Sequence, residues 1–238
     1  MTRIIFFSAL IFAVLLTHVS LTGCSRKSQP VVEEPLKPLP PAPLPEAAPH
    51  DAKPAPPKPA DVRAIVDRIF QTAVTVDAER PYDYMVGDFN GDGSQDIAMV
   101  VKPVESGLAE INSEVANWIL EDPTKIPQPD PKKIVQAPPA PPEPVYVHTN
   151  DTLLAILHGF GPEGWRSPQS RQVYLLKGAV GAGLKVKPVS DLLTAAKDKE
   201  NKPRLNTKML TNGEVFQEVL NGKNGFIYYT GAKYVWYP

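Results

Sequence analysis

Residues Tyr82 to Val101 read YDYMVGDFNGDGSQDIAMVV, and the architecture expected for this chain is built around them. Tyr82 to Gly87 and Ile97 to Val101 are rich in the β-branched and aromatic residues that favour strands. Between them, Asn90-Gly91 and Asp92-Gly93 are dipeptides that favour tight hairpin turns. The segment therefore predicts a β-hairpin with an acidic tip.

The tip carries three carboxylates within nine residues and no lysine or arginine. Asp88, Asn90, Asp92 and Asp96 follow one another at intervals of two, two and four residues, and the Ser94 carbonyl can add a backbone oxygen. Mutual repulsion at about 4 to 6 Å would cost on the order of a kcal/mol per pair of carboxylates. Calcium takes six to eight oxygen ligands, which alternate side chains of a tight loop can supply. We therefore predict a Ca²⁺ site, whereas a plain hairpin turn explains the glycines but not Asp88 and Asp96.

The pattern Asp-x-Asn-x-Asp-Gly-x-x-Asp resembles the calcium loop of FG-GAP and VCBS-type repeats, as in the propellers of integrin α-chains. This resemblance implies that Asp88, Asn90, Asp92, Ser94 and Asp96 are the ligands in a loop between two strands. The loop is not an EF-hand, because its twelfth position is Met99 instead of glutamate. Only one copy is present and a propeller needs about four to eight blades. The metal is therefore expected to be structural.

The amino-terminal segment is organised as a bacterial export signal. Arg3 precedes an apolar run from Ile4 to Leu16, which is too short to span a hydrocarbon core of roughly 30 Å comfortably. The run ends in Leu21-Thr22-Gly23-Cys24, and Cys24 is the only cysteine of the chain. These residues resemble the lipobox of bacterial lipoproteins. An ordinary secretory signal with a chance cysteine is the alternative.

The lipobox resemblance implies that residues 1–23 form a signal peptide and are removed. It also implies that Cys24 is lipidated and acylated at its new amino terminus, with palmitate-type chains that enter the lipid bilayer. One acyl chain anchors marginally and two suffice, so this anchor would be stable. Ser25, in place of aspartate, implies an outer-membrane destination in a diderm host.

Residues 24–59 are expected to form a disordered proline-rich linker. Proline fixes φ and donates no backbone hydrogen bond, so this stretch cannot join a helix or a central strand. A polyproline II conformation, at about 3.1 Å per residue, would give it a reach on the order of 100 Å. We interpret it as a tether, with docking of proline-binding modules as the alternative.

Residues 60–238 are predicted to form a single α+β domain, mainly antiparallel β with two or three helices. Residues 123–144 are read as an exposed proline-rich loop inside it. The predicted helices cover 60–73 with Asp61 as a cap, Leu108 to Ile119 with Ser106 as a cap, and Ser190 to Ala196. Besides those of the hairpin, the predicted strands are Thr75 to Val76, Val145 to Val147, Leu153 to His158, Val173 to Leu176, Val215 to Leu220, Gly225 to Tyr229 and Lys233 to Tyr237.

Two segments partly resemble enzyme motifs. Leu153 to Gly161 is similar to the strand and His-Gly loop of α/β-hydrolases, but no Gly-x-Ser-x-Gly follows and His158 is the last histidine. Gly178 to Gly183 lacks the Gly-x-Gly-x-x-Gly order of a dinucleotide loop and reads as a flexible turn. No catalytic residue is marked out, so we expect a binding or structural module. The alternative is an envelope-polymer hydrolase with its site near His148, His158 and Trp165.

The carboxyl end is rich in aromatic residues, which alternate over both faces of the predicted strands. One face could pack in the core while the other stacks on peptidoglycan or another glycan, although cross-strand packing is the commoner outcome. Nucleic acid is not expected as a partner, because the chain has 25 basic and 26 acidic residues and no basic stripe stands out in the sequence. The expected protein is therefore a cell-envelope lipoprotein whose head lies in the periplasm or at the surface.

Overall fold

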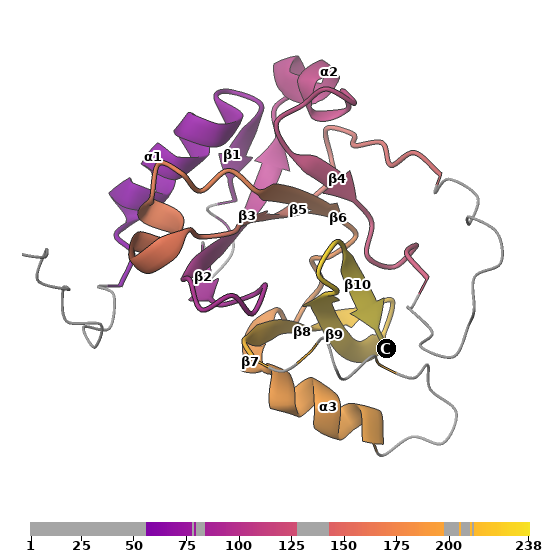
Figure 1. Ribbon diagram of the computed structural model, residues 1–238. Coiled ribbons are helices and arrows are strands. Elements are labelled where there is room, and N and C mark those ends of the chain that lie inside the picture. The colour runs from indigo at the N-terminus through magenta and orange to yellow at the C-terminus, as the bar shows by residue number, and fades with distance from the viewer. Residues whose placement is uncertain are drawn as a thin grey trace, which may run out of the picture. The chain divides into compact units, whose positions relative to one another are not determined.

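A computed structural model describes residues 56–77, 79, 84–127, 143–197, 205, 210 and 212–238. The predicted signal peptide, Cys24 and most of the predicted linker lie outside the described residues, as do residues 128–142 of the internal loop. The described part is an α+β unit with two mostly antiparallel sheets, as the sequence predicts (Figure 1). No helix within the described ranges is long and apolar enough to cross a membrane.

The first sheet has the order β1-β3-β5-β6-β4, and β2 also pairs with β3. The hairpin prediction is confirmed, because β2 and β3 are antiparallel with Tyr84 opposite Met99 and Gly87 opposite Asp96. All pairs are antiparallel except β4 with β6, which is parallel. The strands are β1 (Val74–Val76), β2 (Tyr84–Gly87), β3 (Asp96–Pro103), β4 (Ile119–Glu121), β5 (Leu153–Leu157) and β6 (Val173–Lys177).

The second sheet is an antiparallel meander in the order β10-β9-β8-β7. Its strands are β7 (Lys185–Pro188), β8 (Glu214–Leu220), β9 (Lys223–Tyr229) and β10 (Tyr234–Tyr237). The turn between β8 and β9 holds Asn221 at φ 51° and Gly222 at φ 73°, the left-handed values that Asn-Gly hairpin turns require. Three of these strands were predicted from the sequence, and β7 was not.

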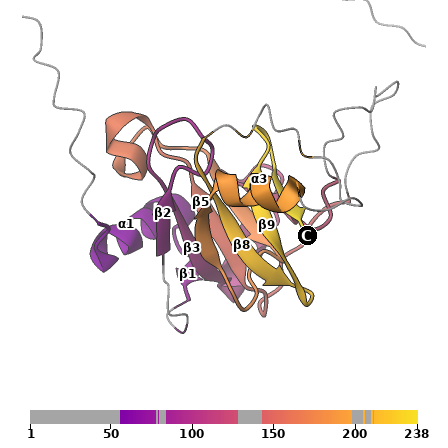
Figure 2. The same cartoon turned by 90° about the horizontal axis from the view of Figure 1, so that it is seen from below.

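Alternation along the strands divides the core into three layers. Ile97, Met99 and Val101 of β3 face α1 (Pro59–Phe70), whereas Ala98 and Val100 face the second sheet. The outer face of that sheet, with Phe226, Tyr228 and Tyr237 among its residues, packs against α3 (Val189–Lys197) (Figure 2). The central strands β3, β5 and β6 are therefore buried on both faces, which is why they read as continuous apolar runs.

The first helix begins two residues earlier than its predicted cap. Lys58, in extended conformation, precedes α1, and Asp61 lies inside the first turn. The Asp61 carboxylate accepts a hydrogen bond from the Lys58 N–H at 3.3 Å. Asp61 therefore stabilises the start of the helix from within, and its assignment as the cap was wrong.

The predicted helix from Leu108 to Ile119 is largely wrong. A 3₁₀ turn, η1 (Glu105–Gly107), leads into a single turn of α2 (Leu108–Ile111), so Ser106 caps nothing. The Asn112 amide ends the helix by donating to the carbonyl oxygens of Leu108 and Val147, and it accepts from the Val147 N–H at 2.7 Å. The backbone N–H and carbonyl of Val147 are thus hydrogen-bonded to the Asn112 side chain. The strand predicted at Val145 to Val147 does not form.

Candidate metal site

The tip of the β2–β3 hairpin is closed by hydrogen bonds to Asp88. Its Oδ1 accepts from the N–H groups of Gly91 at 2.8 Å and Asp92 at 3.0 Å, and its Oδ2 accepts from Gly93 at 3.0 Å. Gly91 and Gly93 have φ values of 75° and 85°, in the left-handed region that favours glycine. The turn is therefore folded around one carboxylate.

Asn90, Asp92 and Ser94 lie on the same tip. The Asn90 amide donates to Asp92 Oδ2 at 2.8 Å, and Asp92 Oδ1 accepts from the Ser94 N–H at 2.7 Å. Asp92 is exposed, while Asn90 and Ser94 are partly exposed. Four of the five predicted ligand residues are thus gathered at the surface, with oxygen atoms of the kind that calcium prefers.

Asp96, the fifth predicted ligand, is fully buried beneath the tip. Its Oδ2 accepts from the N–H groups of Phe89 at 2.7 Å and Asn90 at 3.3 Å, and its Oδ1 accepts from Gly159 at 2.6 Å. Burial raises the pKa of Asp96 to about 7, although the N–H groups of Gly159 and Phe89 oppose that rise. Asp96 therefore ties the tip to the loop after β5.

The start of β8 supports one side of the tip. The Asp88 N–H donates to Glu214 Oε2 at 2.6 Å, and the Glu214 N–H donates to the Asp88 carbonyl oxygen at 2.8 Å. Gly213 allows this approach, because a Cβ there would lie 2.3 Å from the same carbonyl oxygen. Sequence reasoning missed Glu214, since 126 residues separate it from Asp88 and no local pattern joins them.

The other side of the tip rests on η2 (Gly161–Arg166). The Gln95 carbonyl accepts from the Trp165 N–H at 2.7 Å, and Gln95 Oε1 accepts from Trp165 Nε1 and Arg166 Nη1 at 3.1 and 3.2 Å. A Cβ on Gly159 would lie 2.2 Å from the Gln95 carbonyl oxygen. The glycines of this loop thus permit close contact with the hairpin as well as turning the chain.

The aspartates of the tip have hydrogen bonds but no ion pairs within the part of the chain that the structure describes. No described lysine, arginine or histidine forms an ion pair with Asp88, Asp92 or Asp96. No three described His, Cys, Asp or Glu side chains form a group that could hold a metal by themselves. A cation would therefore also need the Asn90 amide and the Ser94 carbonyl. The carboxylate, amide and carbonyl oxygens of the tip are of the chemical type that calcium prefers, and Asp96 lies buried beneath them.

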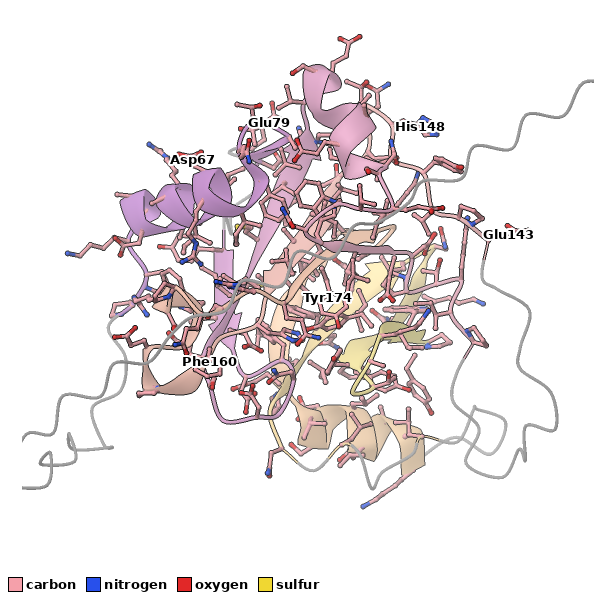
Figure 3. All side chains as sticks on the ribbon, turned by 45° about the horizontal axis from the view of Figure 1, so that its top comes forward. Asp67, Glu79, Glu143, His148, Phe160 and Tyr174 are labelled. Atoms are coloured by element: carbon pink, nitrogen blue, oxygen red, sulfur yellow. The ribbon has the colours of Figure 1, made fainter. Side chains whose placement is uncertain are left out.

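The two histidines of the hydrolase hypothesis are not brought together. His148 is exposed and precedes β5, whereas His158 is buried just beyond the end of β5 (His148 is labelled in Figure 3). His158 Nε2 lies 2.8 Å from the Tyr234 hydroxyl, and burial lowers the pKa of His158 to about 4. The imidazole is therefore neutral at pH 7 and packs among Tyr174, Tyr229 and Tyr234.

The glycine-rich segment before β7 is held by a carboxylate that the sequence analysis did not identify. Glu218 of β8 is fully buried and accepts from the N–H groups of Gly181 at 2.9 Å and Gly183 at 2.7 Å. Its Oε1 also accepts from its neighbour Val219 at 2.7 Å. Gly178 to Gly183 is thus anchored to the second sheet, which corrects its description as a flexible turn.

The aromatic residues of β9 and β10 are mostly core residues. Phe226, Tyr228, Tyr234 and Tyr237 are each less than a tenth exposed, and they lie on both faces of the sheet. Cross-strand packing therefore accounts for these four side chains, whereas Tyr229 and Trp236 are only partly buried. No protein-family model, curated protein or solved structure matches the chain.

Proposed function

We propose that this chain is a lipid-anchored protein of the bacterial cell envelope, whose head is a binding or structural module stabilised by Ca²⁺ at the β2–β3 tip. The observation that supports the metal is the gathering of Asp88, Asn90 and Asp92 on one exposed turn without an ion pair to any described basic side chain. These three side chains and the Ser94 carbonyl would hold the ion. Asp96 offers its remaining lone pair from beneath.

In this proposal the role of calcium is to stabilise the folded head. The tip lies between Glu214 at the start of β8 and Trp165 of η2, so it joins the first sheet to two distant segments. An ion that screens Asp88 from Asp92 would hold the turn in the shape that makes these contacts. The head is then kept rigid at the end of a long tether.

Calcium is expected to raise the melting temperature of the purified chain by about 5 to 10 °C over its value in EDTA. A ligand at one hundred times its Kd adds about 2.7 kcal/mol, and a chain of this size gains about 2 to 4 °C per kcal/mol. Asp92→Asn should abolish the shift, because it removes a charge and an oxygen ligand. Scanning calorimetry and calcium titration measure both effects.

Asp67→Asn is the matched control for Asp92→Asn. Asp67 is also an exposed aspartate, lies on α1 and pairs with no described basic side chain (Figure 3). Both variants should melt close to the parent chain in EDTA. Asparagine at position 92 keeps one oxygen to accept from the Ser94 N–H, and the Asn90 amide that loses its acceptor can bond to water. Equal melting temperatures with calcium and with EDTA in the parent chain would rule out the metal.

The anchor is tested by Cys24→Ser. Each buried methylene contributes about 0.8 kcal/mol to membrane binding, so loss of the acyl chains should move the chain from the membrane fraction to the soluble fraction. Expression in a bacterium fed an alkyne-tagged fatty acid should label the parent and not the variant. Ser25→Ala is the control and should stay labelled. A Cys24→Ser chain that still carries the tag would contradict the proposal.

A further inference from the structure

A hollow of about 360 Å³ lies between the last turn of α1 and the segment that leads into β6. We call it the arginine hollow, because guanidinium groups from both segments line it: Arg68 and Arg171. Asn117 and Ser170 add polar groups, and Ile69 and Val173 add apolar surface.

The hollow has basic groups and no acidic ones. None of the residues that line it is aspartate or glutamate. Among the residues that the structure describes, neither Arg68 nor Arg171 forms an ion pair with a carboxylate. Asp67, the neighbour of Arg68 in sequence, lines a different hollow beside β1. Asp67 is therefore not among the residues that line the arginine hollow.

The backbone that carries each arginine is held in place. Arg68 lies in the last turn of α1, where Val66 and Phe70 are buried in the core and Ile69 packs against it. Among the described residues, its guanidinium donates one hydrogen bond, a long one of 3.4 Å from Nη1 to the Ser167 carbonyl. Arg171 follows Ser170, which is buried and donates to the Gly164 carbonyl at 2.8 Å. Both guanidinium groups therefore extend from well-held backbone positions, and most of their N–H donors have no acceptor among the described residues.

The helix dipole explains only half of this arrangement. A cation in the last turn of a helix is favoured by the carbonyl groups at that end, which accounts for Arg68 without any ligand. Arg171 lies in the loop between η2 and β6, so no helix end accounts for it. Two like charges that line one hollow repel each other, and an anion between them reverses that repulsion.

We propose that the arginine hollow binds a small organic oxyanion, a phosphate or carboxylate group attached to an apolar or ring-shaped part. The planar guanidinium fork matches the paired oxygens of both groups. The apolar side chains of Ile69 and Val173 would contact the rest of the ligand. This site shares no residue with the acidic tip, so its failure and that of the calcium proposal are independent.

The test uses the full chain carrying Cys24→Ser, with phenyl phosphate and benzoate as probes and phenol as the neutral match. Calorimetry should detect binding of the two anions and not of phenol, with affinity that falls as salt rises. Arg68→Gln and Arg171→Gln should each weaken Kd by about tenfold, the loss expected for one charged partner. Arg63→Gln is the control, since it is an exposed arginine of the same helix that lines the other hollow.

Vesicles distinguish the source of the oxyanion. Co-sedimentation with phosphatidylglycerol vesicles, and not with phosphatidylcholine vesicles, would assign the site to a lipid headgroup. Binding of the probes without co-sedimentation would assign it to a free ligand. The proposal is overturned if phenol binds as well as phenyl phosphate, if neither anion binds, or if Arg63→Gln weakens binding as much as Arg171→Gln does.

Discussion

Replacing Asp96 with alanine is expected to lower the free energy of unfolding by about 4 kcal/mol. The Asp96 carboxylate is fully buried and accepts from the N–H groups of Phe89, Asn90 and Gly159. Its removal leaves three donors without an acceptor, and each buried unsatisfied group costs about 1 to 3 kcal/mol. Urea denaturation in EDTA measures the loss with no metal present, so that it reports on hydrogen bonding alone.

Asp96→Asn separates hydrogen bonding from metal binding. One acceptor oxygen remains, but the new amide group faces an N–H group, so the loss in EDTA should be about 2 kcal/mol. If Asp96 is also a calcium ligand, the stabilisation that calcium adds to the parent chain should shrink in this variant. Unchanged stabilisation would confine Asp96 to its hydrogen-bonding role. A loss of less than about 1 kcal/mol for Asp96→Ala would contradict the anchoring role.

Replacing Glu218 with alanine should cost about 3 kcal/mol of stability. The buried Glu218 carboxylate accepts from the N–H groups of Gly181, Gly183 and Val219, and hydrogen bonds to charged groups contribute about 1.5 to 3 kcal/mol each. Because two of the donors belong to the glycine-rich segment, that segment should open first. Urea denaturation measures the total loss, and amide hydrogen exchange locates it.

Gln217→Ala is the matched control for this second prediction, because Gln217 is the preceding residue of β8 and lies on the opposite face of the strand. It is only partly buried, so its truncation should change stability by about 0.5 kcal/mol. Exchange of the Gly181 and Gly183 amides should accelerate in Glu218→Ala and not in Gln217→Ala. Equal exchange in the two variants would show that the carboxylate does not hold the segment.

Elements with a strong local signal were predictable. The Asn221-Gly222 turn and the continuous apolar strands β3, β5 and β6 depend on residues close together in the chain. The predicted helix from Leu108 to Ile119 was wrong although its apolar residues have helical spacing. The chain leaves the helix after Ile111, where the Asn112 side chain forms hydrogen bonds with the distant Val147 backbone. Val115, expected on the buried face of that helix, is 90% exposed.

The parallel strand β4 could not be read from the sequence for a related reason. Its three residues pair with β6, more than fifty positions later, and carry no alternation long enough to measure. The short strand β7 is defined likewise by its pairing with β8. Whether three or four residues form a strand depends mainly on the strand they pair with, because the β-propensity of so few residues is weak.

The candidate metal site likewise has features that the sequence predicts and features that only the tertiary structure shows. The sequence by itself determined the hairpin, its glycines and the spacing of Asp88, Asn90 and Asp92, because turn chemistry acts over only a few residues. Tertiary structure alone decided that Asp96 is buried against Gly159, that Glu214 supports the tip, and that Arg68 and Arg171 line one hollow. These groups meet only when the sheets pack, since burial and charge depend on neighbours that are distant along the chain.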